Sequence, residues 1–271
     1  MLFRSHWSNL DRTIDLNAPA PFDRTAPGQV RSAAAANATR PIVPVNGGVR
    51  SVNVLMNNGV ADYDGLQTQI SYRGNSKIYA AVSYTLSKAT NTTEPDGNGI
   101  GPNDANISRL GEQERGPSVL DQRHRAVITF TYQLPFNLTA GTVTQLASAR
   151  PFNAVTGIDN NGDGANNDRP VINGAVIGKS VFRGTGTQDV ALFLEGRVKP
   201  AGRTILLRVE AFNIFNHPNI LGRAQTTYGD TATPNPTFGQ LVAVGAASNA
   251  LPSLANIDPP RMVQFQVRYI F

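Results

Sequence analysis

The chain has 271 residues, of which 40% are hydrophobic and only 16% are charged, and its formal net charge is +5. Soluble domains carry roughly 25% charged residues, so this composition, with 25 glycines and 18 prolines, favours many strands joined by polar loops over a helical protein. The absence of cysteine excludes disulfides and thiolate metal sites. The lysines and arginines are scattered and form no basic patch, so we expect no nucleic-acid partner.

Apolar and polar residues alternate with a period of two in several segments, which is typical of strands with one apolar face. One or two such strands are expected within residues 1–57. The clearer segments, in chain order, are 66–73, 77–86, 125–134, 137–149, 189–198, 203–211 and 262–271. In the segment from Arg203, Leu207 lies on the apolar face and Arg208 on the polar face. The pattern predicts an all-β antiparallel fold of about seven to nine strands.

The connections between these segments alternate in length. Short hairpins span 72–78, 134–138 and 198–205, and long connections rich in Gly, Asn and Pro span roughly 88–121, 151–187 and 217–260. Outer-membrane barrels combine short periplasmic turns with long extracellular loops in this way. We therefore expect a transmembrane β-barrel segment in the bacterial outer membrane, with residues 217–260 at the rim opposite the C-terminal Phe271.

Aromatic residues are expected at both membrane interfaces of such a barrel. The periplasmic rim would carry Tyr72, Tyr132, Phe136, Tyr269 and Phe271, and the outer rim would carry Tyr84 and Phe215. The alternative is that these rings fill the core of a soluble β domain, because a polar strand face with Arg208 and Glu210 suits a solvated sheet as well as a wet lumen.

The number of predicted strands is small for loops of this length. Seven to nine strands barely reach the eight of the smallest barrels, whereas transporter barrels have about 22. No signal peptide is recognisable at the N-terminus. We therefore expect residues 1–271 to be the C-terminal portion of a transporter barrel, a partial barrel without plug domain or signal peptide, whose first and last long strands do not pair.

Eight segments, in order along nearly the whole chain, resemble the C-terminal barrel region of TonB-dependent outer-membrane receptors, in particular the Oar-like group whose complete members begin with a carboxypeptidase-regulatory-like domain. They are DLNAP (15–19), YDGLQ (63–67), SYTLSK (83–88), DQRHR (121–125), ARPF (149–152), NGDG (161–164) with NDRP (167–170), EAFNIFNHP (210–218) and FGQ (238–240). No single segment is diagnostic, and the resemblance depends on their order.

The resemblance implies TonB-coupled uptake of a substrate across the outer membrane, or passage of a larger molecule. The partners would be outer-membrane lipid, the barrel-assembly machinery, an unidentified transported ligand and, only through the missing N-terminal part, TonB. A plug domain and a TonB box are not recognisable, so we expect a fragment that is inactive alone. The alternatives are a soluble or surface-attached all-β binding module, such as an adhesin or carbohydrate binder, and the inactive product of a decayed gene.

The last segment resembles the aromatic-ended final strand that the barrel-assembly machinery recognises. The apolar side chains on one face of it are Phe265, Val267, Tyr269 and Phe271. The alternative is an ordinary amphipathic strand that ends in Phe. Its place at the terminus favours the assembly signal.

The segment from Asp159 to Asp168 places oxygen-bearing side chains at alternate positions before a glycine. Asp159, Asn161, Asp163 and Asp168 resemble the first half of a calcium loop, whose hard oxygen ligands occupy positions one, three and five. The twelfth position is Pro170 in place of a bidentate Glu, so a polar turn without metal is the alternative. Calcium is the one candidate cofactor.

No arrangement of nucleophile and base is evident. His6, His124 and His217 are far apart in the sequence and lack metal-type spacing. No serine lies in a nucleophile-elbow motif. We therefore expect no enzymatic activity and no catalytic residues.

Overall fold

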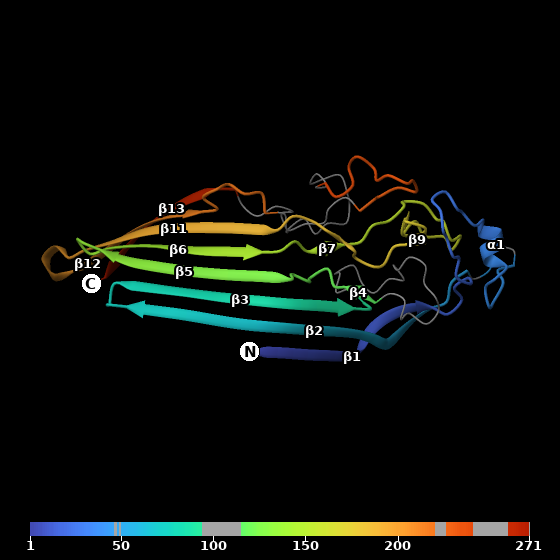
Figure 1. Ribbon diagram of the computed structural model, residues 1–271, viewed down its shortest axis with the longest axis horizontal. Helices are drawn as coiled ribbons and strands as arrows, with labels where there is room; N and C mark the ends of the chain where they lie inside the picture. Colours follow the sequence, from blue (N-terminus) through green and yellow to red (C-terminus); the bar gives the residue numbers. More distant parts are fainter. Residues whose placement is uncertain (46–47, 49, 94–114, 220–225, 241–259, 271) are drawn as a thin grey trace.

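The computed structural model describes residues 1–45, 48, 50–93, 115–219, 226–240 and 260–270 (Figure 1). One large sheet dominates it, with the strand order β1-β2-β3-β5-β6-β11-β12-β13 and with β4 (Gly116–Pro117) beside β3. Its strands are β1 (Leu2–Asp15), β2 (Asn53–Gly74), β3 (Ile78–Asn91), β5 (His124–Leu134), β6 (Leu138–Ala147), β11 (Thr187–Val198), β12 (Thr204–Phe212) and β13 (Met262–Ile270). Every ladder in it is antiparallel. The predicted all-β antiparallel fold is confirmed, and the nine strands of the sheet are within the expected number.

The short connections have turn geometry that fits their sequence. Asn75 and Ser76 both have positive φ, 44° and 47°, as do Phe136 and Asn137, at 63° and 57°. Two consecutive positive φ values define the type I′ turn, whose twist matches that of the strands it joins. The third connection is the 3-10 turn η2 (Pro200–Gly202). All three short connections and the C-terminus lie at one end of the sheet, and the long connections lie at the other (Figure 1).

The two faces of the sheet differ in polarity as the alternation predicts. Cross-strand partners share a face, so the pairs Leu194↔Val209 and Leu207↔Val267 continue one apolar face from strand to strand. The side chains of this face are open to the surroundings: Leu207 is 47% exposed and Phe265 is 79% exposed. An apolar face of this extent without a protein partner is what lipid would cover.

The sheet is open in the part of the chain that the structure describes. β1 and β13 lie at its two edges, and no ladder joins them. The expectation that the first and last long strands lie apart is therefore confirmed. β2 begins at Asn53, whereas the alternation of apolar and polar residues predicts a strand only from Leu66. The strand is therefore longer than predicted.

The long connections contain short elements of their own. They are α1 (Ala33–Asn37), β7 (Pro151–Phe152), β8 (Val171–Ile172), β9 (Ala175–Val176) and β10 (Phe182–Arg183). β10 pairs with β7 and β8 pairs with β9. Of residues 217–260, the described stretch 226–240 lies at the end of the sheet opposite the C-terminus, as expected (Figure 1). Among the described residues, no helix is long and apolar enough to cross a membrane.

Candidate functional site

Three segments far apart in the sequence pack together at the end of the sheet away from the short hairpins. We call residues 16–45, 151–186 and 226–240 the loop layer (Figure 1). Backbone hydrogen bonds join its parts: the Arg31 amide donates to the Asn160 carbonyl at 2.8 Å, and the Val155 amide donates to the Thr226 carbonyl at 2.9 Å. Four aromatic rings add a small apolar cluster with centroids 4.9 to 6.0 Å apart; they belong to Phe152, Phe182, Tyr228 and Phe238.

The predicted calcium loop folds as a chain of side-chain-capped turns. Asp159 Oδ1 accepts the amides of Gly162 and Asp163 at 2.7 and 3.1 Å, and Asp159 Oδ2 accepts the Gly164 amide at 2.9 Å. Asp163 Oδ1 accepts the Ala165 amide at 2.8 Å. Asp and Asn side chains favour such turns because they hydrogen-bond the backbone a few residues on. The acidic groups of this loop therefore already have donors.

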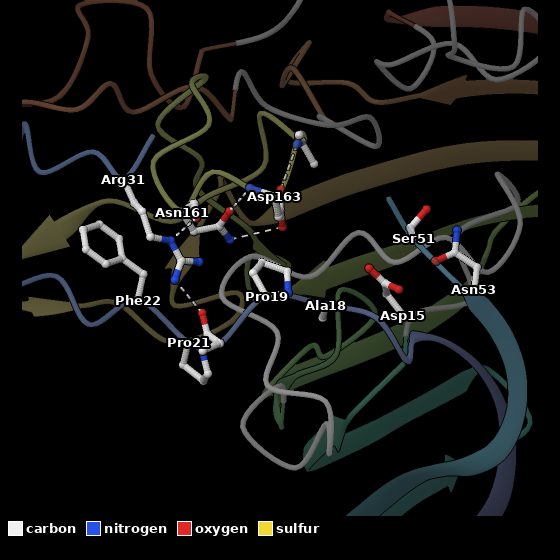
Figure 2. A pocket seen from close by; sticks show the side chains of 13 residues that line it. Asp15, Ala18, Pro19, Pro21, Phe22, Arg31, Ser51, Asn53, Asn161 and Asp163 are labelled. Atoms are coloured by element: carbon white, nitrogen blue, oxygen red, sulfur yellow. Dashed lines mark hydrogen bonds between the residues drawn. The ribbon is translucent and has the colours of Figure 1, made fainter. Parts of the chain in front are cut away.

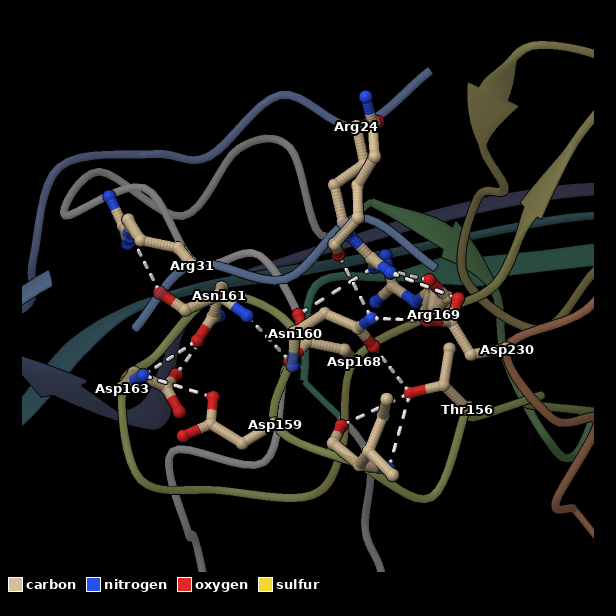
Figure 3. A network of polar contacts seen from close by, with 12 residues as sticks. Arg24, Arg31, Thr156, Asp159, Asn160, Asn161, Asp163, Asp168, Arg169 and Asp230 are labelled. Atoms are coloured by element: carbon tan, nitrogen blue, oxygen red, sulfur yellow. Dashed lines mark hydrogen bonds and ion pairs between the residues drawn. The ribbon is translucent and has the colours of Figure 1, made fainter. Parts of the chain in front are cut away.

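Asp168 is next to the predicted ligand Asn161 and belongs to a buried ionic cluster (Figure 3). Its Oδ2 accepts the amides of Asn160 and Asn161 at 2.8 and 3.2 Å, and its Oδ1 lies 3.7 Å from Arg24 Nη2. Arg24 Nη1 is 4.0 Å from Asp230 Oδ1, so the cluster ties all three segments of the loop layer together. Burial raises the pKa of Asp168 to about 6, against the opposing effect of its two amide donors and Arg24.

Two further arginines fix the backbone of the loop. Arg31 Nε donates to the Asn161 carbonyl at 2.7 Å, and Arg40 Nη2 donates to the Asp163 carbonyl at 3.1 Å. Burial lowers the pKa of Arg31, although three nearby aspartates oppose that shift. Backbone carbonyls that accept from guanidinium groups are less available to a cation. Within the described residues, no three His, Cys, Asp or Glu side chains come together as a metal site, and calcium binding stays a prediction.

Arg40 also connects the loop to the end of β1. Its Nη1 donates to the Asn17 carbonyl at 2.7 Å and lies 3.3 Å from Asp15 Oδ2. The buried Asn17 side chain satisfies the backbone of a segment 25 residues on, accepting the Ile42 amide at 2.7 Å and donating to the Ile42 carbonyl at 2.9 Å. The loop layer is thus held by buried polar groups with specific partners.

A cavity of about 190 Å³ opens between the N-terminal segment and this loop (Figure 2). Asp15, Phe22, Arg31 and Asp163 are among the residues that line it. The guanidinium of Arg31 lies 5.3 Å from the centroid of the Phe22 ring, within cation–π range. The cavity therefore combines an aromatic ring, a cation and two carboxylates, a set of groups that suits a small polar ligand.

The polar face of the sheet carries a second ionic group in the middle of β12. Arg208 lies 2.9 Å from Glu210 and 3.6 Å from Glu195, and its guanidinium is 4.0 Å from the centroid of the Phe193 ring. Phe193 in turn packs on Gly141, where a Cβ would meet the ring at 2.5 Å. If the sheet lines a lumen, these groups face it.

The predicted assembly residues Phe265, Val267 and Tyr269 share the apolar face of β13 and are all exposed. Phe271 lies outside the described residues. The histidines have separate neighbours: His6 Nδ1 is 2.7 Å from Asp62, His124 Nδ1 is 2.7 Å from the Tyr84 hydroxyl, and His217 Nδ1 is 2.9 Å from Asn219.

Sequence reasoning missed the arginines of the loop layer, Arg24, Arg31 and Arg40. They are spaced irregularly in a segment without strand periodicity, and Arg24 meets a carboxylate 144 residues away. A signal for their partners was the presence of DLNAP and NDRP among the resemblance segments, because Asn17 and Asp168 belong to these two motifs.

The fold and the distribution of polarity define a membrane barrel protein. Residues 5–188 match the family model described as "Outer membrane beta barrel domain", which covers more than half of the chain. The chain therefore belongs to this family and is located in the bacterial outer membrane. No curated protein matches the chain significantly.

Proposed function

We propose that the chain forms the C-terminal part of the barrel of a TonB-dependent outer-membrane receptor and contributes to uptake of a substrate. The observation that carries the proposal is the loop layer, in which three connections pack into one ordered assembly above a sheet with a polar face. A passive structural barrel does not require its outer connections to be joined by buried side-chain partners, whereas a receptor needs a preformed surface that contacts the ligand.

The resemblance segments support the proposal because several of them meet in this layer. DLNAP supplies the buried Asn17, NGDG and NDRP supply Asp163 and Asp168, and ARPF and FGQ bring Phe152 to within 5.6 Å of Phe238 between ring centroids. The cavity beside Arg31 and Phe22 is a candidate ligand contact at this surface. The proposed role is transport, without catalysis.

The open sheet supports the view that further strands complete the barrel. β1 and β13 each leave one edge without a partner among the described strands, and in hydrocarbon each unpaired backbone group costs several kcal/mol. We propose that strands beyond this chain close the barrel and that the plug and TonB-contacting parts belong to the same larger protein.

The test uses cells that carry the complete gene, cells that lack it and cells without functional TonB. Depletion of compounds from the growth medium is followed by untargeted mass spectrometry. We expect at least one compound to be removed only when both the gene and TonB are present. Gene-dependent removal that persists without TonB would indicate a passive pore and contradict the proposal, as would the absence of any gene-dependent removal.

A further inference from the structure

The apolar face of β1, β2 and β3 ends abruptly in charged rows toward the loop layer. The last apolar row consists of Leu2, Leu66 and Leu86, which are consecutive cross-strand partners. The next residues on the same face form the row Arg4, Asp64 and Lys88. The change from leucine to charge takes place over two residues in each strand, so it marks a sharp boundary on the outward surface.

A second charged row follows the first. His6 pairs with Asp62 and Asp62 pairs with Thr90 across the ladders, and Arg115 makes an ion pair with Asp62. Arg4 Nε is 2.8 Å from Asp64 Oδ1. Three permanent cations, Arg4, Lys88 and Arg115, thus face two carboxylates, and the patch has a net positive charge.

These cations point outward even where they have a carboxylate partner. The Arg4 side chain is 84% exposed and the Arg115 side chain is 51% exposed, and Lys88 is exposed as well. A guanidinium has five N–H donors, so one contact with an aspartate leaves most of them available. The aspartates hold the arginines in place without consuming their capacity to bind an anion.

The other end of the same apolar face has a different boundary. Toward the short hairpins, the outward residues of these strands and β5 are Tyr72, Ile78 and Tyr132, which are aromatic or aliphatic. Short turns lie on the periplasmic side of outer-membrane barrels and long loops lie outside. The charged rows are therefore on the outer side, at the level where lipid headgroups meet the acyl chains.

We propose that Arg4, Lys88 and Arg115 bind the phosphate groups of a lipid of the outer leaflet, whose acyl chains lie against Leu2, Leu66 and Leu86. Guanidinium groups bind phosphate with two parallel hydrogen bonds, and lysine adds a point charge. The leucine row directly below supplies the apolar contact that a free anion would not use. The inference concerns the outward surface and does not depend on the transported substrate or on TonB.

The test uses the complete barrel that contains this chain, folded in dodecylmaltoside micelles, and native mass spectrometry of bound lipid. The probes are diphosphoryl lipid A, its dephosphorylated form and inorganic phosphate. We expect the diphosphoryl form to bind at least about tenfold more tightly than the dephosphorylated form, because a charge-assisted hydrogen bond contributes about 1.5–3 kcal/mol and 1.4 kcal/mol corresponds to tenfold. Equal binding of the two lipids, or displacement of the lipid by millimolar inorganic phosphate, would overturn the proposal.

Variants locate the site. The triple variant Arg4→Gln, Lys88→Gln, Arg115→Gln should lose most of the preference for the phosphorylated lipid. The matched control Arg73→Gln, Lys77→Gln, Arg203→Gln removes the same charge from exposed residues at the hairpin end. This control should keep the preference for the phosphorylated lipid. An equal loss in both would show that net charge, and not this patch, determines binding. If the triple variant does not fold, the single variants Arg4→Gln and Lys88→Gln take its place, and an undiminished preference for the phosphorylated lipid in both would overturn the proposal.

Discussion

The sheet exposes large apolar side chains, whereas the loop layer buries polar ones. In the sheet, the large apolar side chains such as Ile70, Val82 and Phe265 are exposed. In the loop layer, the fully buried side chains include Asn17, Asn160 and Asp168. The sheet derives its stability from hydrogen-bonded ladders and from the lipid around it, and the loop layer derives its own from specific polar contacts. The two regions should therefore respond differently to the same kind of substitution.

The largest effect is expected from Arg24→Met. Removing one partner of a buried ion pair leaves the other charge uncompensated and costs about 3–5 kcal/mol, and here Asp168 and Asp230 both lose their cation. Hydrogen exchange should show loss of protection throughout residues 151–186, while β5 and β6 stay protected. Arg203→Met, at an exposed turn residue, is the control and should change neither region. Simultaneous loss in sheet and loop layer would mean that the two regions do not fold separately.

Leu207→Arg should damage the sheet and leave the loop layer as it is. A charge on the lipid face near the bilayer midplane costs about 2–4 kcal/mol, so we expect a lower yield of folded protein by heat-modifiable electrophoresis, measured in the complete barrel. The neighbouring Arg208→Leu, on the polar face, should be milder, although it leaves Glu195 and Glu210 without their cation. Equal effects of the two variants would remove the assignment of the faces.

The pH dependence of the loop layer should follow Asp168. Its pKa is raised from 3.8 to about 6, so the folded state binds the proton more tightly than the unfolded state does. The stabilisation by the proton is complete at low pH and is lost as the pH rises from about 4 to about 6. The hydrogen-exchange protection of residues 156–169 should fall as the pH rises across this window. In the variant Asp168→Asn the protection should no longer depend on pH in this range. An unchanged slope in that variant would assign the titration to another group.

The smallest effect concerns calcium. The calcium hypothesis predicts that calorimetry on the folded protein detects binding at millimolar calcium and that Asp159→Ala with Asp163→Ala abolishes it. Binding should be weak, because both carboxylates already accept backbone amides. If the unmutated protein releases no heat with calcium, the segment is a turn without a metal.

The strands of the sheet were predictable from the sequence where one face meets lipid and the other meets water. The first half of β2 was not predictable because Asp62 and Asp64 stand on the outward face above the apolar rows, so no alternation remains. A strand was expected within residues 1–57 and β1 confirms it, but Arg4 and His6 on its outward face obscure its bounds. The turns of the 159–168 loop followed from its Asn, Asp and Gly content, but the arginines that hold it could not be paired with their partners from sequence alone. Many carboxylates are available to each arginine, and only the folded chain selects one.

The order of strands in the sheet has a consequence for how the protein can change over generations. Each of the strands β1, β2, β3, β5, β6, β11 and β12 pairs with the next long strand in the chain, so no connection has to cross over another strand. Closing a flexible loop costs only about 0.6 kcal/mol more for each doubling of its length. An insertion that leaves the contacts of the loop layer intact can therefore accumulate in a long connection while the ladders on either side keep their register. Such a change in an outer connection costs less than a change in the membrane-facing strands.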